Sequence, residues 1–439
     1  MSFEGEPNHG TNLDPSTLSF ESLWSRRRII ASYWLVVLLA VPLWWKATSI
    51  DRLSLPENRV RGLSGKEISF PLRIHLDSSA VSHSVSEIAD AVTKVLSDDL
   101  KEGGSGLAVS VTSSDLEEHK GYSVKLLQDG SKNVVRGRDL LLSTPNHESE
   151  QFGQSSTRRL ADVMRALVAP PQALVSGSAQ QAVKYASRYR LAFTLLNQDS
   201  ASGNAALSWD IQSSIHRYLK PTLEKLSVLH NFTIESQVQL HAPLAFDPTI
   251  VTHNNSQSFG LTPEDLTVFV NSAEWTLSSS VSNDPVLHFV VFVPSLLNNP
   301  LYILDKKNAV TNSNAFILPQ WGGIVVLNSP KEHLSIDDLH STFGIFESQL
   351  HALLAVPTLP ADVTSDEIGP FTDWQLDALV RRRTRENFGD SRETLESIIL
   401  LVNQISNMPV GQDVKGDVQD ALSALDQASL SFLRNLESW

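Results

Sequence analysis

The stretch IIASYWLVVLLAVPLWW, Ile29–Trp45, decides where the rest of this chain folds. It contains no charged residue, and it lies between three consecutive arginines (26–28) and Lys46. A helix needs about 17 to 25 apolar residues to cross a bilayer. Aromatic rings, which stand near both ends of this stretch, favour the membrane–water interfaces. The pattern therefore predicts a transmembrane signal anchor over residues 29–46.

Two other interpretations of this stretch remain open on sequence alone. A cleaved signal peptide would use the small residues 47–49 as its cleavage site, but the bulky Trp44-Trp45-Lys46 crowd that site. The region before the apolar run is also long and partly acidic for a signal peptide. A buried core helix is the second alternative, and the basic triplet with the aromatic ends fits it poorly. The retained anchor is the favoured interpretation.

The orientation of this anchor follows from features on its two sides. Lysine and arginine are nearly balanced across it, but the arginines at 26–28 cluster directly against the apolar run, which favours a cytosolic N-terminal tail over residues 1–28. Two glycosylation sequons, at Asn231 and Asn254, lie beyond the anchor. We therefore expect a linker over residues 47–66 and a large lumenal part after it.

The composition limits the possible classes of function. The chain has 439 residues, of which 41% are hydrophobic and 19% charged, as expected for one large or two ordinary folded domains. A net charge of −14 argues against nucleic-acid binding, which depends on neutralising phosphates. Cysteine is absent, which excludes disulfides, a cysteine nucleophile and thiolate metal sites. Stability must then come from a sizeable core or from partner subunits.

Alternating strand and helix patterns predict an α/β fold of mixed sheets flanked by helices. We expect a first lumenal α/β block over residues 67–200, a second over 201–334, and a helical C-terminal region over 335–439. Strands are predicted at 67–76, 107–111, 122–127, 134–142, 189–196, 232–240, 286–293, 301–304, 315–318 and 324–327. Helices are predicted at 81–95, 157–168, 207–229, from 263 onward, and over 339–354, 373–405 and 414–436.

Some of these predictions include details that a structure can test. Asp129-Gly130 is expected to form the turn before the strand at 134–142, and Pro221 to kink the helix at 207–229. Apolar residues alternate with polar ones over 232–240, which predicts a half-buried strand, whereas the continuous apolar run at 286–293 predicts a strand buried on both faces. Thr262 is the expected N-cap of a helix with Pro263 at its first position.

Searches for catalytic and metal-binding patterns find none. His147-Glu148 lacks the second histidine of a zinc-protease motif, and no nucleophile elbow, phosphate loop or Asp-x-Asp pair is present. His333, His340 and His351 are too irregularly spaced to predict a metal site. The sequence therefore predicts no catalytic residue, no metal and no cofactor.

Four local features each have a structural interpretation that we favour. The acidic pairs Asp98-Asp99 and Asp337-Asp338 are expected to cap helices or remain solvated, and Gly103–Gly106 to end a helix. Trp321-Gly322-Gly323 either permits a close backbone approach or, the favoured reading, forms a bulge or tight turn in a hairpin. The basic run Arg381–Arg385 could hold lipid headgroups or an acidic partner, but a solvated helix face with an Arg382–Glu386 pair is favoured.

Several stretches, taken in order, resemble the PIG-S family of glycosylphosphatidylinositol (GPI) transamidase subunits. They are SYWLVVLLAVPLWWKATSI (Ser32–Ile50) followed by Leu55-Pro56, NNPLYILD (Asn298–Asp305), FILPQWGGIVVLN (Phe316–Asn328), DALVRRRTRENFGDSRETLESI (Asp377–Ile398) and ISNMPVGQDV (Ile405–Val414). Each stretch is weak by itself, but the ordered set is specific and spans nearly the whole chain from Trp24.

The resemblance implies a non-catalytic scaffold subunit in the endoplasmic reticulum membrane. Its complex cleaves a C-terminal signal from a proprotein and joins the new carboxyl end to a GPI lipid. The implied partners are membrane lipid and the other transamidase subunits, including a cysteine-protease-like subunit that supplies the nucleophile. Family members carry a second membrane span near the C-terminus; none precedes Trp439, and we expect the helical tail to lead back toward the membrane. The alternatives are a stand-alone single-pass hydrolase or transferase and a ligand-binding ectodomain.

Overall fold

The structure is a computed structural model of the full chain. It describes residues 22–50, 52–63, 65, 68–77, 85–103, 106–113, 121–127, 132–143, 154–171, 182–253, 256–271, 283–305, 307–311, 314–366, 369–405 and 407–434. The chain forms two compact units. Unit 1 combines Met1–Gly62 with Thr394–Ser423, and unit 2 combines Leu63–Glu393 with Ala424–Trp439.

Unit 1 is helical. Helix α1 (Leu23–Thr48) confirms the helix predicted over the apolar stretch and extends it at both ends, so that it includes the three arginines. The unit also holds most of α2 (Glu57–Leu63), the last residues of α9 (Asp373–Gln404) and the first half of α10 (Gln412–Arg434). A backbone hydrogen bond from Leu53 N to Val410 O (3.1 Å) joins the segment after α1 to the α9–α10 connection.

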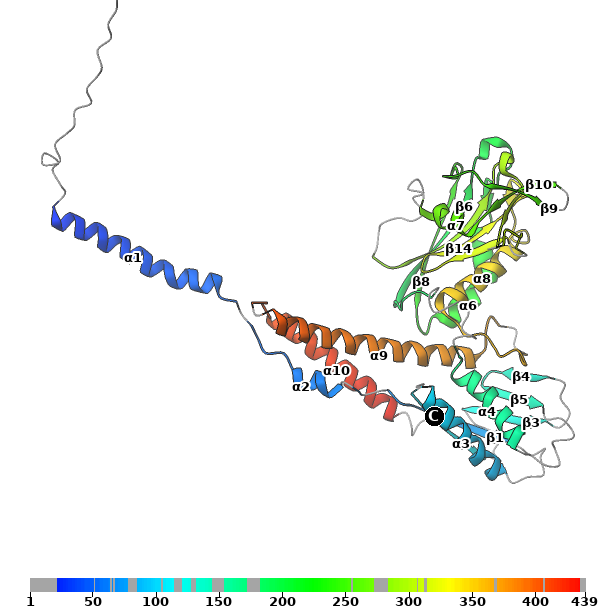
Figure 1. The fold of residues 1–439 in the computed structure, drawn as a ribbon, viewed down its shortest axis with the longest axis horizontal. Helices are drawn as coiled ribbons and strands as arrows, with labels where there is room; N and C mark the ends of the chain where they lie inside the picture. The colour runs from blue at the N-terminus through cyan, green and yellow to red at the C-terminus, as the bar shows by residue number, and fades with distance from the viewer. Residues whose placement is uncertain are drawn as a thin grey trace, which may run out of the picture. The chain divides into compact units, whose positions relative to one another are not determined.

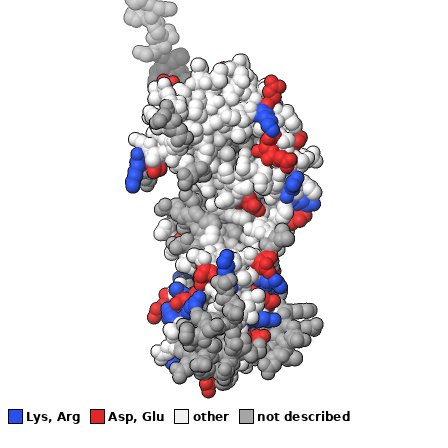
Figure 2. Space-filling view, turned by 90° about the vertical axis from the view of Figure 1, so that its right-hand side faces the viewer, with Lys and Arg blue, Asp and Glu red and all other residues white. Residues whose placement is uncertain are grey.

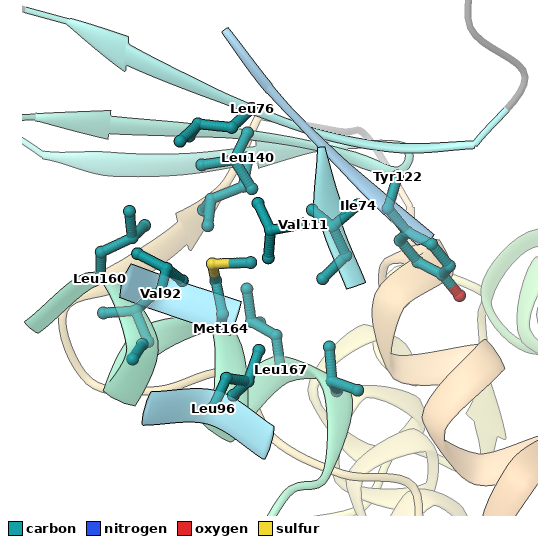
Figure 3. Close-up of a cluster of buried hydrophobic side chains, with 14 of the residues drawn as sticks. Ile74, Leu76, Val92, Leu96, Val111, Tyr122, Leu140, Leu160, Met164 and Leu167 are labelled. Carbon is teal, nitrogen blue, oxygen red and sulfur yellow. The ribbon is translucent and has the colours of Figure 1, made fainter. Parts of the chain in front are cut away.

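Unit 2 contains a six-stranded sheet in the order β16-β4-β5-β3-β1-β2. The strands of this sheet are β1 (Phe70–Asp77), β2 (Leu107–Ser113), β3 (Tyr122–Leu127), β4 (Asn133–Arg136), β5 (Asp139–Ser143) and β16 (Val363–Ser365). Helices α3 (Val85–Glu102) and α4 (Gln154–Val168) share its hydrophobic core, because their apolar residues recur at helical spacing. Figure 3 shows Val92 and Leu96 of α3 with Leu160, Met164 and Leu167 of α4 beside the strand residues Ile74, Leu76, Val111 and Leu140.

Unit 2 also contains a five-stranded sheet in the order β13-β14-β11-β6-β8 (Figure 1). Its strands are β6 (Arg188–Asn197), β8 (Asn231–Gln239), β11 (Val286–Val293), β13 (Ala315–Leu318) and β14 (Gly322–Val326). All neighbours pair in parallel except β13 with β14. Parallel sheets are normally covered on both faces, and this sheet contributes residues to two separate hydrophobic cores.

Different elements pack against the five-stranded sheet in its two hydrophobic cores. The larger core includes apolar residues of α8 (His340–Leu354) and of α5 (Ile211–Ser214) and α6 (Lys220–Leu226), which a π-helical turn (Ile215–Leu219) joins. The smaller core includes residues of α7 (Pro263–Asn271) and of the sheet β12-β10-β9. The remaining elements are short: β7 (Ser208–Trp209), β9 (Thr249–His253), β10 (Ser256–Leu261), β12 (Leu301–Ile303), β15 (His333–Leu334) and the 3-10 turns Ser200–Ser202 and Leu296–Asn298.

The predicted fold class, α/β with mixed sheets and a helical C-terminal part, is confirmed. Strand β11 is buried along almost its whole length, as its continuous apolar run predicts. Thr262 caps α7 reciprocally with Asp265: the Thr262 N–H donates to Asp265 Oδ2 (2.9 Å), and the Asp265 N–H donates to Thr262 Oγ1 (3.3 Å). The predicted break near Pro221 is the π-helical turn that precedes α6.

Three strand predictions need correction. The strand predicted over 134–142 is two antiparallel strands, β4 and β5, because the chain turns at Gly137, which has a φ of 57°. Strand β3 pairs with β5 in parallel and does not pair with β4, the next strand along the chain. The predicted turn at Asp129-Gly130 lies outside the described residues. The strand predicted at 189–196 pairs with β8 and β11 and not with the first sheet.

The C-terminal region confirms one prediction and differs from another. Helix α9 confirms the helix predicted over 373–405 and is continuous through Gly389. Strand β16, within the region predicted to be helical, pairs with β4 of the six-stranded sheet. Its three residues are too few to show a period in the sequence. The division of the chain at residues 66, 200 and 334 stays a prediction.

Candidate functional site

The described residues show no cluster of histidine, aspartate and glutamate that could hold a metal ion. The three histidines considered in the sequence lie in different surroundings. His333 contacts Asp210 (3.5 Å), His340 lies beside the Tyr218 ring, and His351 is half-buried against Phe371. The structure therefore does not bring these histidines together, and His147-Glu148 lies outside the described residues.

Asp98 and Asp337 are exposed and Asp338 caps a turn, as the sequence favours, whereas Asp99 is half-buried in an ion pair between two helices. Asp338 accepts hydrogen bonds from the Ser335 N–H (3.1 Å) and from Lys331 Nζ (2.6 Å), and these bonds lower its pKa to about 2. Asp99 pairs with Arg158 at 3.0 Å. Helix α3 ends at Glu102, where the predicted glycine stop begins. These carboxylates stabilise local structure.

Both interpretations of Trp321-Gly322-Gly323 describe the structure. Trp321 closes the turn of the β13–β14 hairpin, as favoured, and Gly322 and Gly323 are the first residues of β14. They also permit a close approach, because a Cβ on Gly323 would lie 1.9 Å from Gln349 Oε1, and a Cβ on Gly322 would lie 2.0 Å from the His288 carbonyl oxygen. Gln349 of α8 donates to the Phe316 carbonyl oxygen of β13 (3.1 Å). Gly323 therefore allows α8 to pack directly on the hairpin, and Gly322 allows β11 to approach β14 closely.

The arginines of α9 are the first set of residues whose arrangement the sequence did not predict. We call Arg381, Arg382 and Arg383 the arginine clamp. Arg382 reaches Glu386 at 3.6 Å, as predicted. The predicted solvated face is nevertheless wrong, because Arg383 is 5% exposed and Arg381 and Arg382 are only partly exposed.

The clamp binds the C-terminal ends of two helices. Arg381 Nη2 donates to the carbonyl oxygen of Val168, the last residue of α4 (3.2 Å). Arg383 Nη2 donates to the carbonyl oxygens of Leu354, the last residue of α8 (3.1 Å), and of Val183 (3.3 Å). Arg382 donates to the Ala355 carbonyl oxygen. The last carbonyls of a helix have no partner within the helix and carry a partial negative charge, so cations stabilise them.

A second group on α9 extends this contact to the six-stranded sheet. Asp377 accepts hydrogen bonds from Arg138 Nε (2.9 Å) and from the Tyr122 hydroxyl, and Arg381 Nη1 donates to that hydroxyl oxygen (2.9 Å). Burial raises the pKa of Tyr122 to about 12, so the phenol keeps its proton. Figure 3 shows the Tyr122 hydroxyl pointing out of the hydrophobic cluster. The first half of α9 thus connects both sheets of unit 2.

Strand β8 carries an exposed apolar stripe. The strand predicted at 232–240 is confirmed, but its burial is wrong: Ile234 is 41% exposed, Val238 38% and Leu240 48%. Alternation predicts only that one side of a strand is apolar. Because β8 is the outermost strand of its sheet among the described residues, only Phe232 packs on the core. An exposed apolar edge is a common feature of surfaces that bind other proteins.

The structure describes one of the two predicted glycosylation sites. Asn231 is exposed at the first residue of β8, where its side chain is accessible for modification. Asn254 lies outside the described residues. Acidic and basic side chains are interspersed on the face of the molecule that Figure 2 shows.

Helix α1 is long enough to cross a membrane, with 26 residues and few charges, and none of its residues is buried. At about 1.5 Å per residue such a helix is about 39 Å long, which exceeds the roughly 30 Å hydrocarbon core of a bilayer. The fold and these surfaces define the class as an α/β protein with one candidate membrane helix near its N-terminus.

Comparison with known proteins places the chain within a family. Residues 31–437 match the family of PIG-S, the phosphatidylinositol-glycan biosynthesis class S protein, so the chain belongs to that family. The chain is 28% identical to the GPI-anchor transamidase component PIGS of Rattus norvegicus, over 90% of this chain and 81% of that protein. It is 26% identical to the GPI transamidase component PIG-S homolog of Schizosaccharomyces pombe (93% and 73%) and 23% identical to the GPI transamidase component GPI17 of Saccharomyces cerevisiae (88% and 74%).

Proposed function

We propose that this chain is a membrane-anchored, non-catalytic scaffold subunit of the GPI transamidase complex. The observation that carries this proposal is the PIG-S family match over residues 31–437, together with relatives that are named as transamidase components. Because the relatives align with most of this chain, the proposal concerns the whole lumenal body and no single segment of it.

The chemistry of the chain supports a role without catalysis. Cysteine is absent, so the chain supplies no thiolate nucleophile. The arginine clamp is the densest cluster of charge on the described part of α9. Its arginines form hydrogen bonds with backbone carbonyls at the ends of helices in unit 2. We infer that a cysteine-protease-like partner subunit carries the nucleophile, while this chain contributes binding surface such as the β8 stripe.

The proposed location is the endoplasmic reticulum membrane, with the bulk of the chain in the lumen. Helix α1 crosses the bilayer over residues 29–45, and the arginines at 26–28 remain on the cytosolic side. Asn231 and Asn254 then lie in the compartment where glycosylation occurs. Asn231 is exposed and therefore accessible to glycosylation in that compartment.

The test uses cells that lack this chain and carry a secreted reporter with a C-terminal GPI signal. We expect the reporter to keep its uncleaved signal, and the tagged full chain to restore its surface display and to co-purify with other membrane subunits in mild detergent. A chain that purifies alone and turns over substrate by itself would instead support a stand-alone enzyme. Unchanged reporter processing in the deficient cells would contradict the proposal.

A further inference from the structure

The α9–α10 connection in unit 1 is unusually free of charge. No residue from Ser397 to Gln412 is charged, although 19% of the whole chain is. Charged residues return immediately on both sides, at Glu396 and Asp413. A solvent-exposed helix end normally carries charged side chains, since these are the residue types least often buried. Most described residues of this segment are exposed, so the absence of charge needs a cause other than burial among the described residues.

Apolar side chains are exposed in this uncharged segment. Leu395, Ile399 and Val402 recur at helical spacing and are buried. In contrast, Leu400 is 61% exposed, Leu401 47% and Ile405 46%. Leu401 and Ile405 are four residues apart, so they lie on the same side of the helix end. We call Leu400, Leu401 and Ile405 the apolar tip.

The apolar tip is held close to the end of α1 by contacts within unit 1. Arg52 Nη2 donates to the Val402 carbonyl oxygen (2.7 Å), and Asn403 Nδ2 donates to Glu57 Oε1 (3.2 Å). The Leu53 N–H donates to the Val410 carbonyl oxygen (3.1 Å). The segment after α1 therefore binds both sides of the connection, next to the apolar tip (Figure 1).

This attachment limits the distance between the apolar tip and the membrane. Helix α1 ends at Thr48, and the chain from Thr48 to Leu53 spans at most about 18 Å even when fully extended. The headgroup region on each side of a bilayer is about 5–8 Å thick. If α1 crosses the bilayer, the connection must lie at or near its lumenal surface. This limit depends on chain length and not on the direction of α1.

We propose that the apolar tip inserts into the lumenal headgroup region of the phospholipid bilayer and forms a second membrane contact beside α1. The inference rests on the proposed membrane crossing of α1. Exposed leucine and isoleucine side chains gain from burial at the acyl boundary, and a segment without charges loses no solvated charge on entering it. A contact at the apolar tip together with α1 would fix the orientation of unit 1 on the membrane.

The absence of cysteine from the chain allows a direct test with single-cysteine variants. An environment-sensitive fluorophore is attached at Leu401→Cys and at Ile405→Cys of the full chain. Each variant is purified with its accompanying subunits and reconstituted into phosphatidylcholine vesicles, with or without lipids that carry a nitroxide quencher on the acyl chain. The complex with the natural chain provides the blank for labelling of other subunits.

Two reference positions calibrate the experiment. Leu39→Cys lies in α1 and reports whether that helix enters the bilayer. Ser423→Cys is exposed on α10, roughly 16 Å along the helix from Gln412, and serves as the aqueous control. All of these side chains are exposed in the chain, so the substitutions leave its core intact.

We expect lipid nitroxides to quench the labels at 401 and 405 about threefold more than the label at 423. Equal quenching at 401, 405 and 423, with strong quenching at 39, would overturn the inference and leave the membrane anchor intact. A label at 401 that is shielded from water but insensitive to lipid quencher would also overturn it, because another protein would then cover the tip. Absence of quenching at 39 would reject the proposed anchor itself.

Discussion

The two ends of helix α9 differ in which side chains they bury: arginines are buried at one end, whereas leucines are exposed at the other. In its first half, in unit 2, three consecutive arginines are partly or fully buried and bind backbone carbonyls. In its last turns, in unit 1, no residue after Glu396 is charged, yet Leu400 and Leu401 are exposed. Guanidinium groups can be buried where carbonyls of helix ends accept hydrogen bonds from their Nη atoms. The exposed leucines indicate that the partner of the last turns lies outside the residues that the structure describes.

The largest effect is expected from removing the buried arginine of the first half. Arg383→Ala leaves the carbonyl oxygens of Leu354 and Val183 without a donor in a buried position. Loss of such bonds costs about 1–3 kcal/mol for each group left unsatisfied, so we expect the free energy of unfolding to fall by about 3 kcal/mol. Thermal unfolding of the full chain in detergent measures this, and the exposed Arg385→Ala is the matched control. Equal stability of the two variants would show that the clamp is a surface feature.

A pH-dependent effect is expected at His351, in the last turn of α8. Burial lowers the pKa of His351 to about 4, whereas the unfolded side chain has a pKa of about 6.5. The unfolded chain therefore binds more protons between these values, and stability falls as the pH drops from about 6.5 toward 4, by up to about 3 kcal/mol. His351→Leu should weaken the dependence of the melting temperature on pH, and the part that remains is expected from His288, whose pKa burial also lowers to about 4. The exposed His241→Gln is the control substitution; a pH dependence equal to that of the natural chain in His351→Leu would contradict this assignment.

A smaller effect is expected where α9 meets the six-stranded sheet. Asp377→Asn keeps the shape of the side chain but removes the charge that Arg138 Nε contacts at 2.9 Å. A charge-assisted hydrogen bond in a partly exposed site contributes about 1–2 kcal/mol. We expect a melting temperature a few degrees lower, with Asp390→Asn, an exposed carboxylate on the same helix, as the control. A loss as large as that of Arg383→Ala would mean that the sheet contact dominates the clamp.

The smallest effect on stability is expected at the other end of α9. Leu401→Gln combined with Ile405→Gln changes exposed side chains, so unfolding should change by less than about 0.5 kcal/mol. The same variant should lose the lipid contact of the apolar tip, as measured by nitroxide quenching at Leu400→Cys placed in that variant. A strongly destabilised variant would show that these side chains belong to the core, and the contrast between the two ends of α9 would fail.

Features that depend on local pattern could be predicted from the sequence. The apolar run of α1, the buried strand β11 and the reciprocal cap of Thr262 with Asp265 each depend on neighbouring residues only. Features that depend on distant segments could not. The sequence shows the arginine run but not that the ends of α4 and α8 meet it, because these lie far away along the chain. Likewise, alternation located strand β8 but could not show that it lies at the edge of its sheet.

The ordered family resemblance identified the protein class, while the candidate surfaces required the structure. The quoted stretches at residues 32–50, 377–398 and 405–414 lie in α1, α9 and the α9–α10 connection. The three stretches have different structural roles. The first is the candidate membrane helix, the second contains the arginines that bind helix ends, and the third begins at Ile405 of the apolar tip. Contacts between residues more than three hundred positions apart, such as Arg52 with Val402, explain why sequence alone did not reveal this.

The most direct test of the central proposal is a scan of the serine, histidine, aspartate and glutamate residues of the lumenal part in cells that otherwise lack this chain. Each variant is measured twice, by recovery of the assembled complex in mild detergent and by surface display of a GPI-anchored reporter. We expect surface display of the reporter to fall only in variants in which recovery of the assembled complex also falls, because this subunit holds a catalytic partner in place. One variant that assembles normally yet eliminates cleavage and transfer would contradict it and would assign catalysis to this chain.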